Sequence, residues 1–182
     1  MHWELKEITV WHLERLVPLS DPPPSRSYEL VNLVAPDPGF CRYLYATVGA
    51  PWLWYEKIGW SLSEWQEHVK QPNVQFWVAY ISGNPIGYFE IKHGTDGASE
   101  ICLFGLMPNW VGKGLGSALL QDAIHQAFKP SQRRIWLHTC SLDHPNALSN
   151  YLKHGFTLFK EENFNAKVPA EPLEPFPGAY SL

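Results

Sequence analysis

The sequence predicts a mixed α/β domain in which helices cover both faces of a central sheet. Three observations support this prediction. The chain has 182 residues, 45% of them apolar, which is enough to bury one sizeable core. Its middle third contains a β-hairpin pattern. Its last third alternates short apolar runs with helical periodicity, which favours a sheet that is parallel at least in its later part.

Composition and charge argue against several classes of protein. The net charge is −4 and no basic run occurs, so nothing indicates a nucleic acid or an anionic membrane as partner. No stretch approaches the roughly 18 apolar residues of a membrane span. Glu4 and Glu7 stand where a secretory signal would be apolar. We therefore expect a cytoplasmic protein.

The cysteines indicate neither a disulfide framework nor a metal site. Cys41, Cys102 and Cys140 share no close spacing, which fits buried thiols in a reducing compartment. His138 and His144 flank Cys140, but no fourth ligand stands out in the sequence. We expect no bound metal.

The first third of the chain predicts two strands and a helix. Residues 3–11 and 28–34 alternate like strands, and a stiff proline-rich connector at 21–25 separates them. Turn chemistry at 36–39 then leads into a helix at 40–48.

The middle of the chain predicts a short helix and a hairpin. Residues 61–64 (SLSE) form a capping box, in which the first serine and the glutamate satisfy free N–H groups of a helix reaching about Lys70. Gly83-Asn84 then separates two strand patterns at 74–82 and 85–92.

The stretch from residue 100 to 120 predicts a strand, a glycine-rich loop and a helix. Residues 100–107 form an apolar run that ends at Pro108, and helical periodicity begins at Leu115 and stops before Pro130. Glycines let a ligand approach the backbone, and a helix N-terminus offers free N–H groups. A phosphate or pyrophosphate would fit between the two elements. The alternating glycines of the loop are Gly112, Gly114 and Gly116.

Two familiar phosphate-binding motifs fail on spacing. A nucleotide P-loop requires a glycine, four further residues and then Gly-Lys-Ser/Thr, but Met107 stands at the first position and Gly114 at the last. A dinucleotide fingerprint requires a third glycine where Ser117 or Leu119 stands. A glycine-rich turn without a ligand stays open as an alternative.

The loop resembles the acyl-coenzyme A site of the GNAT superfamily of N-acetyltransferases. That family has Gln/Arg-x-x-Gly-x-Gly/Ala after a strand ending in Val-x-Pro. Here Leu106-Met107-Pro108 is followed by residues 111–116 (VGKGLG), with Val111 in place of the usual Gln or Arg. The main-chain donors of the motif do not depend on that side chain.

A second motif lies downstream. A strand pattern at 134–139 precedes residues 141–156 (SLDHPNALSNYLKHGF), which are similar to the family's polar turn, Ala-x-x-x-Tyr helix and Gly-Phe. His144 replaces the family's asparagine, although Asn146 lies nearby. A last strand is expected at 156–162. The matching residues are Ala147, Tyr151, Gly155 and Phe156.

The resemblance implies the GNAT fold, a mixed and mostly antiparallel sheet that splays open between its two central strands, here 100–107 and 134–139. It implies one domain over 1–182, with a core at about 28–162 and a proline-rich tail at about 163–182. It also implies acetyl-CoA as cofactor, and because family members are often dimers it admits a homodimer. The cofactor-binding residues it implies are Phe104, Gly105, Leu106, Gly112, Lys113, Gly114, Leu115, Gly116, Ser117, His144 and Asn146. For His144 and Asn146, capping of the following helix is the alternative.

Acetyl transfer to an amine needs a base for the amine and a proton for the departing thiolate. Glu100 has the spacing to Gly114 of the family's catalytic glutamate and is the first candidate for the base; an ion-paired carboxylate is the alternative. Glu90, His93 and Asp96 are weaker candidates for this role. Tyr151 matches the family tyrosine that protonates the sulfur, unless it only packs against the sheet.

The acceptor is expected to be a primary amine of a small molecule or a peptide. Five aromatic residues crowd the segment where family members build their acceptor side. Aromatic faces attract ammonium groups, so Trp52, Trp54 and Tyr55 are candidates for substrate binding. The alternative is that these rings, together with Trp60 and Trp65, fill core.

The resemblance to the GNAT superfamily implies an acetyl-CoA-dependent N-acetyltransferase, which we expect to act by direct transfer in a ternary complex. No cysteine falls within the two motifs as an obvious acyl carrier, although Cys102 could face the site from its strand. The alternative from another class is a non-catalytic acyl-CoA sensor, which the off-pattern Val111 and His144 keep open.

Overall fold

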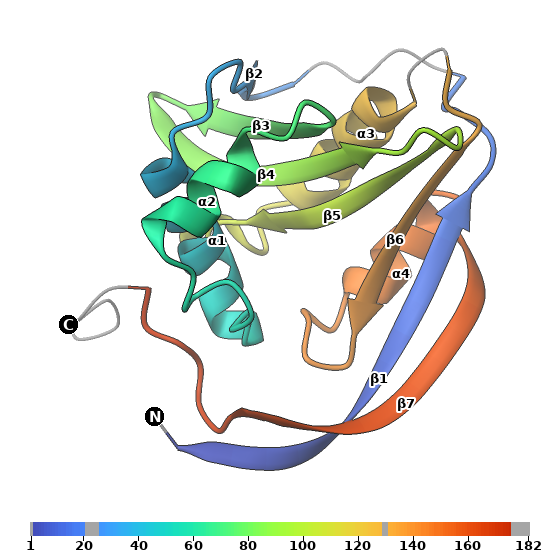
Figure 1. Ribbon diagram of the computed structural model, residues 1–182. Helices are drawn as coiled ribbons and strands as arrows, with labels where there is room; N and C mark the ends of the chain where they lie inside the picture. Colours follow the sequence, from blue (N-terminus) through green and yellow to red (C-terminus); the bar gives the residue numbers. More distant parts are fainter. Residues whose placement is uncertain (1, 21–25, 129–130, 176–182) are drawn as a thin grey trace.

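A computed structural model describes residues 2–20, 26–128 and 131–175. The predicted proline-rich connector at 21–25, the helix stop at Pro130 and the end of the tail lie outside these residues. The sheet has seven strands in the order β2-β3-β4-β5-β6-β1-β7 (Figure 1). The elements are β1 (Trp3–Arg15), β2 (Glu29–Asn32), α1 (Pro38–Gly49), α2 (Leu62–Val69), β3 (Val74–Ile81), β4 (Asn84–His93), β5 (Ala98–Leu106), α3 (Leu115–Ala127), β6 (Arg134–Cys140), α4 (Ala147–Lys153) and β7 (Thr157–Pro169), with single 3₁₀ turns at Ala50–Trp52 and Pro108–Trp110.

The sheet is mixed and mostly antiparallel, as the resemblance implied. Its parallel pairing joins β5 to β6, and only from Ala98 to Glu100 on β5 and from Arg134 to Trp136 on β6. Beyond these residues the two strands diverge, which is the predicted splay. The expectation of a parallel later part was wrong for β7, because β1 inserts between β6 and β7 and pairs antiparallel with both.

The N-terminal and C-terminal strands are longer than predicted. β1 continues to Arg15, and β7 continues past the expected end at residue 162 to Pro169. The cause is long-range pairing, since residues 3–9 of β1 find their partners at 163–169 of β7. The predicted tail boundary at 163 is therefore six residues inside a strand that ends at Pro169.

Helices cover both faces of the sheet (Figure 1). On one face, α3 buries Leu119, Leu120 and Ile124 against apolar residues of the strands, among them Leu13 and Ile135. On the other face, α1 buries Leu44 and Val48 against β3 and β4. None of the helices within the described residues is long and apolar enough to cross a membrane.

The predicted helix caps and the predicted hairpin are present in the structure, with one shift in the position of the turn. Asp37, from the predicted turn, caps α1 by accepting a hydrogen bond from the N–H of Phe40. The capping box of α2 is present. The hairpin turn consists of Ser82 and Gly83, one residue earlier than predicted, because both residues have positive φ (50° and 77°), as a primed two-residue turn requires.

A buried polar cluster fastens the chain before β2 to α3. Asp122 is fully buried, accepts a hydrogen bond from the Tyr28 hydroxyl at 2.6 Å, and pairs with the Arg26 guanidinium at 2.6 Å. Burial and the neighbouring carboxylate raise the pKa of Tyr28 well above its usual value.

Candidate active site

A cavity of about 900 Å³ lies where β5 and β6 diverge. It extends from the glycine loop, past the second half of β5, to the loop that follows α1. Ile8, Val10 and Phe164 of β1 and β7 also line it, which the sequence did not predict. The residues predicted to bind cofactor that line it are Phe104, Gly105, Leu106, Gly112, Gly114, Gly116, Ser117, His144 and Asn146.

The glycine loop leaves its backbone open to a ligand. Gly112 and Gly114 have φ of 80° and 78°, and a Cβ on either would meet no atom within 4 Å. Gly114 is the N-cap of α3 and provides no side-chain cap, so free N–H groups of the first turn face the loop. Such an arrangement fits an anionic diphosphate.

Two residues of the predicted cofactor set do not line the cavity. The Lys113 ammonium lies over the ring of Trp110, 4.5 Å from its centroid. Leu115 packs against the main core instead. Both side chains therefore support the loop from outside the cavity.

His154 adds a polar contact that sequence reasoning missed. Its Nδ1 lies 2.7 Å from the carbonyl oxygen of Asn150, and its Nε2 lies 2.9 Å from the Ser117 hydroxyl. A carbonyl only accepts, so Nδ1 carries a proton, and Nε2 of the neutral ring accepts from Ser117. This pair fixes Ser117 at the mouth of the glycine loop. No family motif marked His154.

The turn before α4 is held by Asp143, another residue that the motifs did not single out. Its carboxylate accepts from the Thr139 hydroxyl at 2.6 Å and from the N–H of Cys140 at 3.0 Å. In the same turn, His144 Nδ1 accepts from the N–H of Asn146. Asn146 is the N-cap of α4 but makes no side-chain capping bond, so the capping alternative does not hold for its side chain.

Tyr151 of α4 lines the cavity and is only 7% exposed. Its ring meets those of Phe104 and Phe156 edge-on, at centroid distances of 6.1 Å and 6.0 Å. Burial, and secondarily the charge of Asp143, raise the pKa of Tyr151. The phenol therefore keeps its proton at neutral pH.

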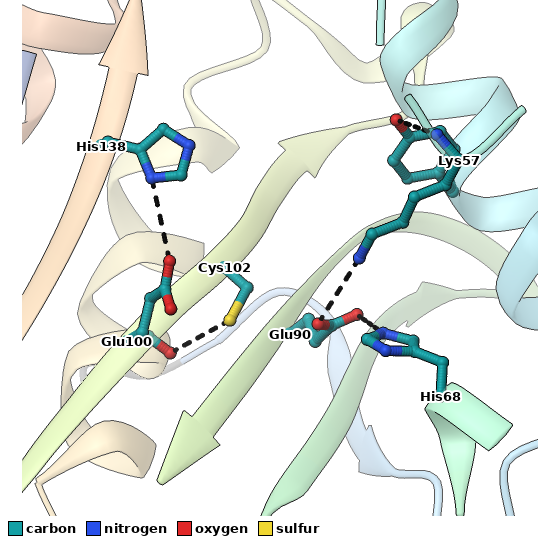
Figure 2. Close-up of polar contacts among 7 residues, drawn as sticks. Lys57, His68, Glu90, Glu100, Cys102 and His138 are labelled. Carbon is teal, nitrogen blue, oxygen red and sulfur yellow. Dashed lines mark hydrogen bonds and ion pairs between the residues drawn. The ribbon is translucent and has the colours of Figure 1, made fainter. Parts of the chain in front are cut away.

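Glu100 reaches the cavity from β5, just where pairing with β6 ends. Its carboxylate points toward His138 of β6, with Oε1 3.8 Å from Nδ1 (Figure 2). The side chains are 22% and 49% exposed, so water reaches both and the ion pair is weak. Glu100 is thus a solvated carboxylate in the cavity wall.

A second carboxylate, Glu90 of β4, lines the same cavity and is almost fully buried. Its Oε2 lies 2.9 Å from Nε2 of His68, and its Oε1 lies 4.0 Å from Nζ of Lys57 (Figure 2). The Lys57 ammonium also lies 5.1 Å from the ring centroid of Trp60. Neither His68 nor Lys57 was predicted, since neither belongs to a motif.

The remaining base candidates lie elsewhere. His93 contacts the Ser99 hydroxyl at 2.8 Å, and Asp96 accepts from the N–H of Ala98 within the β4–β5 turn. Neither lines the cavity. The geometry therefore narrows the four candidates to Glu100 and Glu90.

The aromatic residues of the segment from Trp52 to Trp65 divide between the two alternatives, substrate binding and core packing. Trp52, Trp54 and Tyr55 line the cavity. Trp60 and Trp65 join a core cluster next to His68, and Trp65 is 1% exposed. Trp54, although it lines the cavity, also packs against this cluster. The cavity rings are themselves held by protein contacts: Trp52 by His144 (5.0 Å between centroids), Trp54 by Asp143 (3.3 Å) and Tyr55 by Trp3 (5.6 Å).

Cys102 and Cys140 line the cavity as free thiols. Burial raises the pKa of both, that of Cys140 to about 11, so each thiol is almost wholly protonated at neutral pH. Among the residues the structure describes, no group of three or more His, Cys, Asp or Glu side chains could hold a metal ion.

Comparison with solved structures supports the fold. A GCN5-related N-acetyltransferase from Sphaerobacter thermophilus superposes with a TM-score of 0.63 at 17% identity, over 91% of this chain and 54% of that one. A tandem GNAT protein from the clavulanic acid biosynthesis pathway gives 0.58 at 18% identity (91% and 55%). Spermidine N-acetyltransferase from Vibrio cholerae, in complex with CoA and spermine, gives 0.57 at 19% identity (78% and 93%).

The chain spans about half of the first two of these structures. No curated protein matches the sequence. The sequence profile of the Acetyltransferase (GNAT) family matches residues 35–156, which include the glycine loop, both central strands and Tyr151. With the splayed sheet and the cavity at the splay, this match shows that the chain belongs to the GNAT acetyltransferase family.

Proposed function

We propose that the protein is an acetyl-CoA-dependent N-acetyltransferase that moves an acetyl group directly to a primary amine of a small molecule or a peptide. One observation carries the proposal: a single cavity joins the open glycine loop, the free part of β5, the protonated Tyr151 and two carboxylates. These are the groups that acyl transfer from a phosphate-bearing thioester to an amine requires.

The glycine loop and β5 would hold the cofactor. Acetyl-CoA, when bound, supplies the activated thioester. The free N–H groups at the start of α3 would face its diphosphate, and the backbone of residues 104–106 would face its amide-containing arm. Val111 does not interfere, because these donors belong to the main chain.

Glu100 is the base we favour. An amine with the pKa of free lysine is almost wholly protonated at neutral pH, so its proton must leave before it can attack. Glu100 is reachable by water and is paired only weakly, which leaves its oxygens free to accept that proton directly or through water. Glu90 is less suited, because His68 and Lys57 already occupy its two oxygens.

Tyr151 would supply the proton to the departing thiolate. Its raised pKa keeps the phenol in the donor form at neutral pH. The raised pKa values of the cavity thiols argue against a cysteine acyl carrier, since so little thiolate is present. We therefore favour direct transfer in a ternary complex.

The test is a calorimetric titration with acetyl-CoA, followed by thiol release over a panel of amines. Amine-dependent release supports the transferase, and initial-rate patterns that intersect support the ternary complex. Binding without release from any amine favours the alternative, a non-catalytic acyl-CoA sensor. Glu29→Gln, on the exposed edge strand β2, serves as a control for charge-removing variants in the cavity.

A further inference from the structure

Lys92 lies beside the favoured base in the wall of the cavity. It belongs to β4, and the strand register places it directly opposite Glu100 of β5. Opposite residues of an antiparallel pair share one face of the sheet, with Cβ atoms about 5 Å apart. Both residues line the cavity, and Lys92 is exposed. A positive and a negative side chain therefore stand next to each other at the place where the acceptor amine has to lose its proton.

These two side chains do not pair with each other. Among the residues that the structure describes, Glu100 forms its ion pair with His138 of β6, and no ion pair joins Lys92 to any carboxylate. β4 and β6 are the two neighbours of β5, on opposite sides of it. The Glu100 carboxylate in Figure 2 is thus turned toward β6, away from the strand that carries Lys92.

The other neighbours of Lys92 on this face of the sheet do not neutralise it. Its register partner on β3 is Val74, which is buried and apolar. Glu90 lies two residues earlier on β4 and so shares the face, but its two oxygens are already taken up by His68 at 2.9 Å and Lys57 at 4.0 Å. The Lys92 ammonium is therefore a cation in the cavity wall without a protein anion beside it.

Such a cation next to the base distinguishes between amines. A protonated amine that approaches Glu100 also approaches the like charge of Lys92, which weakens its binding. An acceptor that carries a carboxylate beside its amine turns this repulsion into a charge-assisted hydrogen bond. In an α-amino acid a single carbon separates the two groups, so one molecule can place its amine at Glu100 and its carboxylate at Lys92 on the neighbouring strand.

We propose that the acceptor is a free α-amino acid, whose carboxylate is bound by Lys92 while its amine faces Glu100. The proposal rests on the transferase function above and names the class of its acceptor. The side chain of the amino acid extends toward the aromatic part of the same cavity, where Trp52, Trp54 and Tyr55 favour an apolar or aromatic group.

Matched pairs of ligands test the carboxylate site by binding. Phenylalanine and phenethylamine differ only in the carboxylate, as do leucine and isoamylamine. In calorimetric titrations of the full chain in excess coenzyme A, each amino acid should bind about tenfold tighter than its amine. Lys92→Met should abolish this difference, and Lys92→Arg, which keeps the charge, should retain it. Lys70→Met is the matched control, because Lys70 is exposed at the end of α2 and does not line the cavity.

Thiol-release kinetics distinguish carboxylate binding from an effect of Lys92 on the base. If Lys92 binds the carboxylate, Lys92→Met raises the KM for the amino acids about tenfold and changes kcat little, while the KM for the amines does not rise. If Lys92 only modifies Glu100, the variant changes kcat and its pH profile equally for both members of each pair, which would contradict the proposal. Lys92→Gln is a second neutral variant if Lys92→Met does not fold.

Three results would overturn the proposal: equal binding of amino acid and amine by the wild type, no measurable binding of any amino acid, or a preference that survives Lys92→Met. Failure of the transferase function gives a different result. Amino acids would then still bind through Lys92, but no acceptor would release thiol from acetyl-CoA.

Discussion

The carboxylate of Glu90 and the imidazole of His68 meet at 2.9 Å in the wall of the cavity. Because a carboxylate accepts hydrogen bonds, Nε2 of His68 carries the proton. The His68 ring is in turn enclosed by Trp60, Trp65 and Phe76, at centroid distances of 5.4 to 6.0 Å. Glu90 is thereby fixed, whereas Glu100 remains in contact with water.

Because Glu90 is fixed and Glu100 is solvated, mutations of the two carboxylates should have different effects. Glu100→Gln should lower kcat by about 10²-fold or more, the usual contribution of a general base, and leave stability nearly unchanged. Glu90→Gln should instead cost about 1.5–3 kcal/mol of unfolding free energy, because it removes the charge that His68 and Lys57 face. Thiol-release kinetics and chemical denaturation measure the two effects. The reverse result would make Glu90 the base.

Tyr151→Phe should lower kcat by about 10²-fold without changing the KM for acetyl-CoA, because only the proton donor is lost. The pKa of Tyr151 is raised above its usual 10, so the phenol stays protonated as the pH rises to 10 and is lost as a donor only above it. Wild-type kcat should therefore show no decline from this group between pH 7 and 9. A decline in that range that the phenylalanine variant abolishes would contradict the assignment.

The buried cluster at Asp122 predicts a large stability effect away from the cavity. Asp122→Ala leaves the Tyr28 hydroxyl and the Arg26 charge without their partner and should cost about 2–4 kcal/mol. Glu67→Ala is the comparison, since its pair with Lys70 is exposed and should be worth about 0–1 kcal/mol. Urea denaturation of both variants measures the difference. Similar losses would mean that the buried cluster contributes little.

Substitution of Trp54 most directly tests whether the aromatic rings of the cavity recognise the acceptor amine. It packs on Gly49 so closely that a Cβ there would collide with its side chain. Trp54→Ala should raise the KM for amines several-fold. Gly49→Ala should also raise it, because the added methyl group would displace the indole ring without removing it. Ala50, which is buried but does not line the cavity, offers the control Ala50→Gly. If the folded Trp54 variant keeps an unchanged KM across amines, the cavity rings do not recognise the acceptor.

Signals that lie within a few residues predicted their structures well. The capping box at Ser61, the primed hairpin turn near Gly83 and the glycine loop at 112–116 each depend on the local backbone. No local signal of this kind predicted that β1 would insert between β6 and β7. β1 finds its partners at least 120 residues away, and its alternating pattern is the same whichever strands it joins.

The residues of the candidate site likewise fall into two groups: those that a local motif predicted and those that it did not. Glu100 and Tyr151 could be picked out because each stands at a fixed spacing within a motif. His68, Lys57 and His154 could not, since α2, the loop before it and the end of α4 bring them to the cavity wall or its neighbourhood only through packing. Ile8 and Phe164 line the cavity because β1 pairs with β7, which local patterns do not specify.

The splay between β5 and β6 also sets how quickly amide protons exchange with solvent. Beyond Glu100, β5 keeps β4 as a neighbour but has lost β6, so the amides of residues 101–106 that point away from β4 face the gap without a strand partner. These amides should exchange with deuterium much faster than those bonded to β4. A ligand that fills the gap with its own acceptors would slow their exchange, and would thereby give these amides the protection that full-length pairing of β5 with β6 would give in an unbroken sheet.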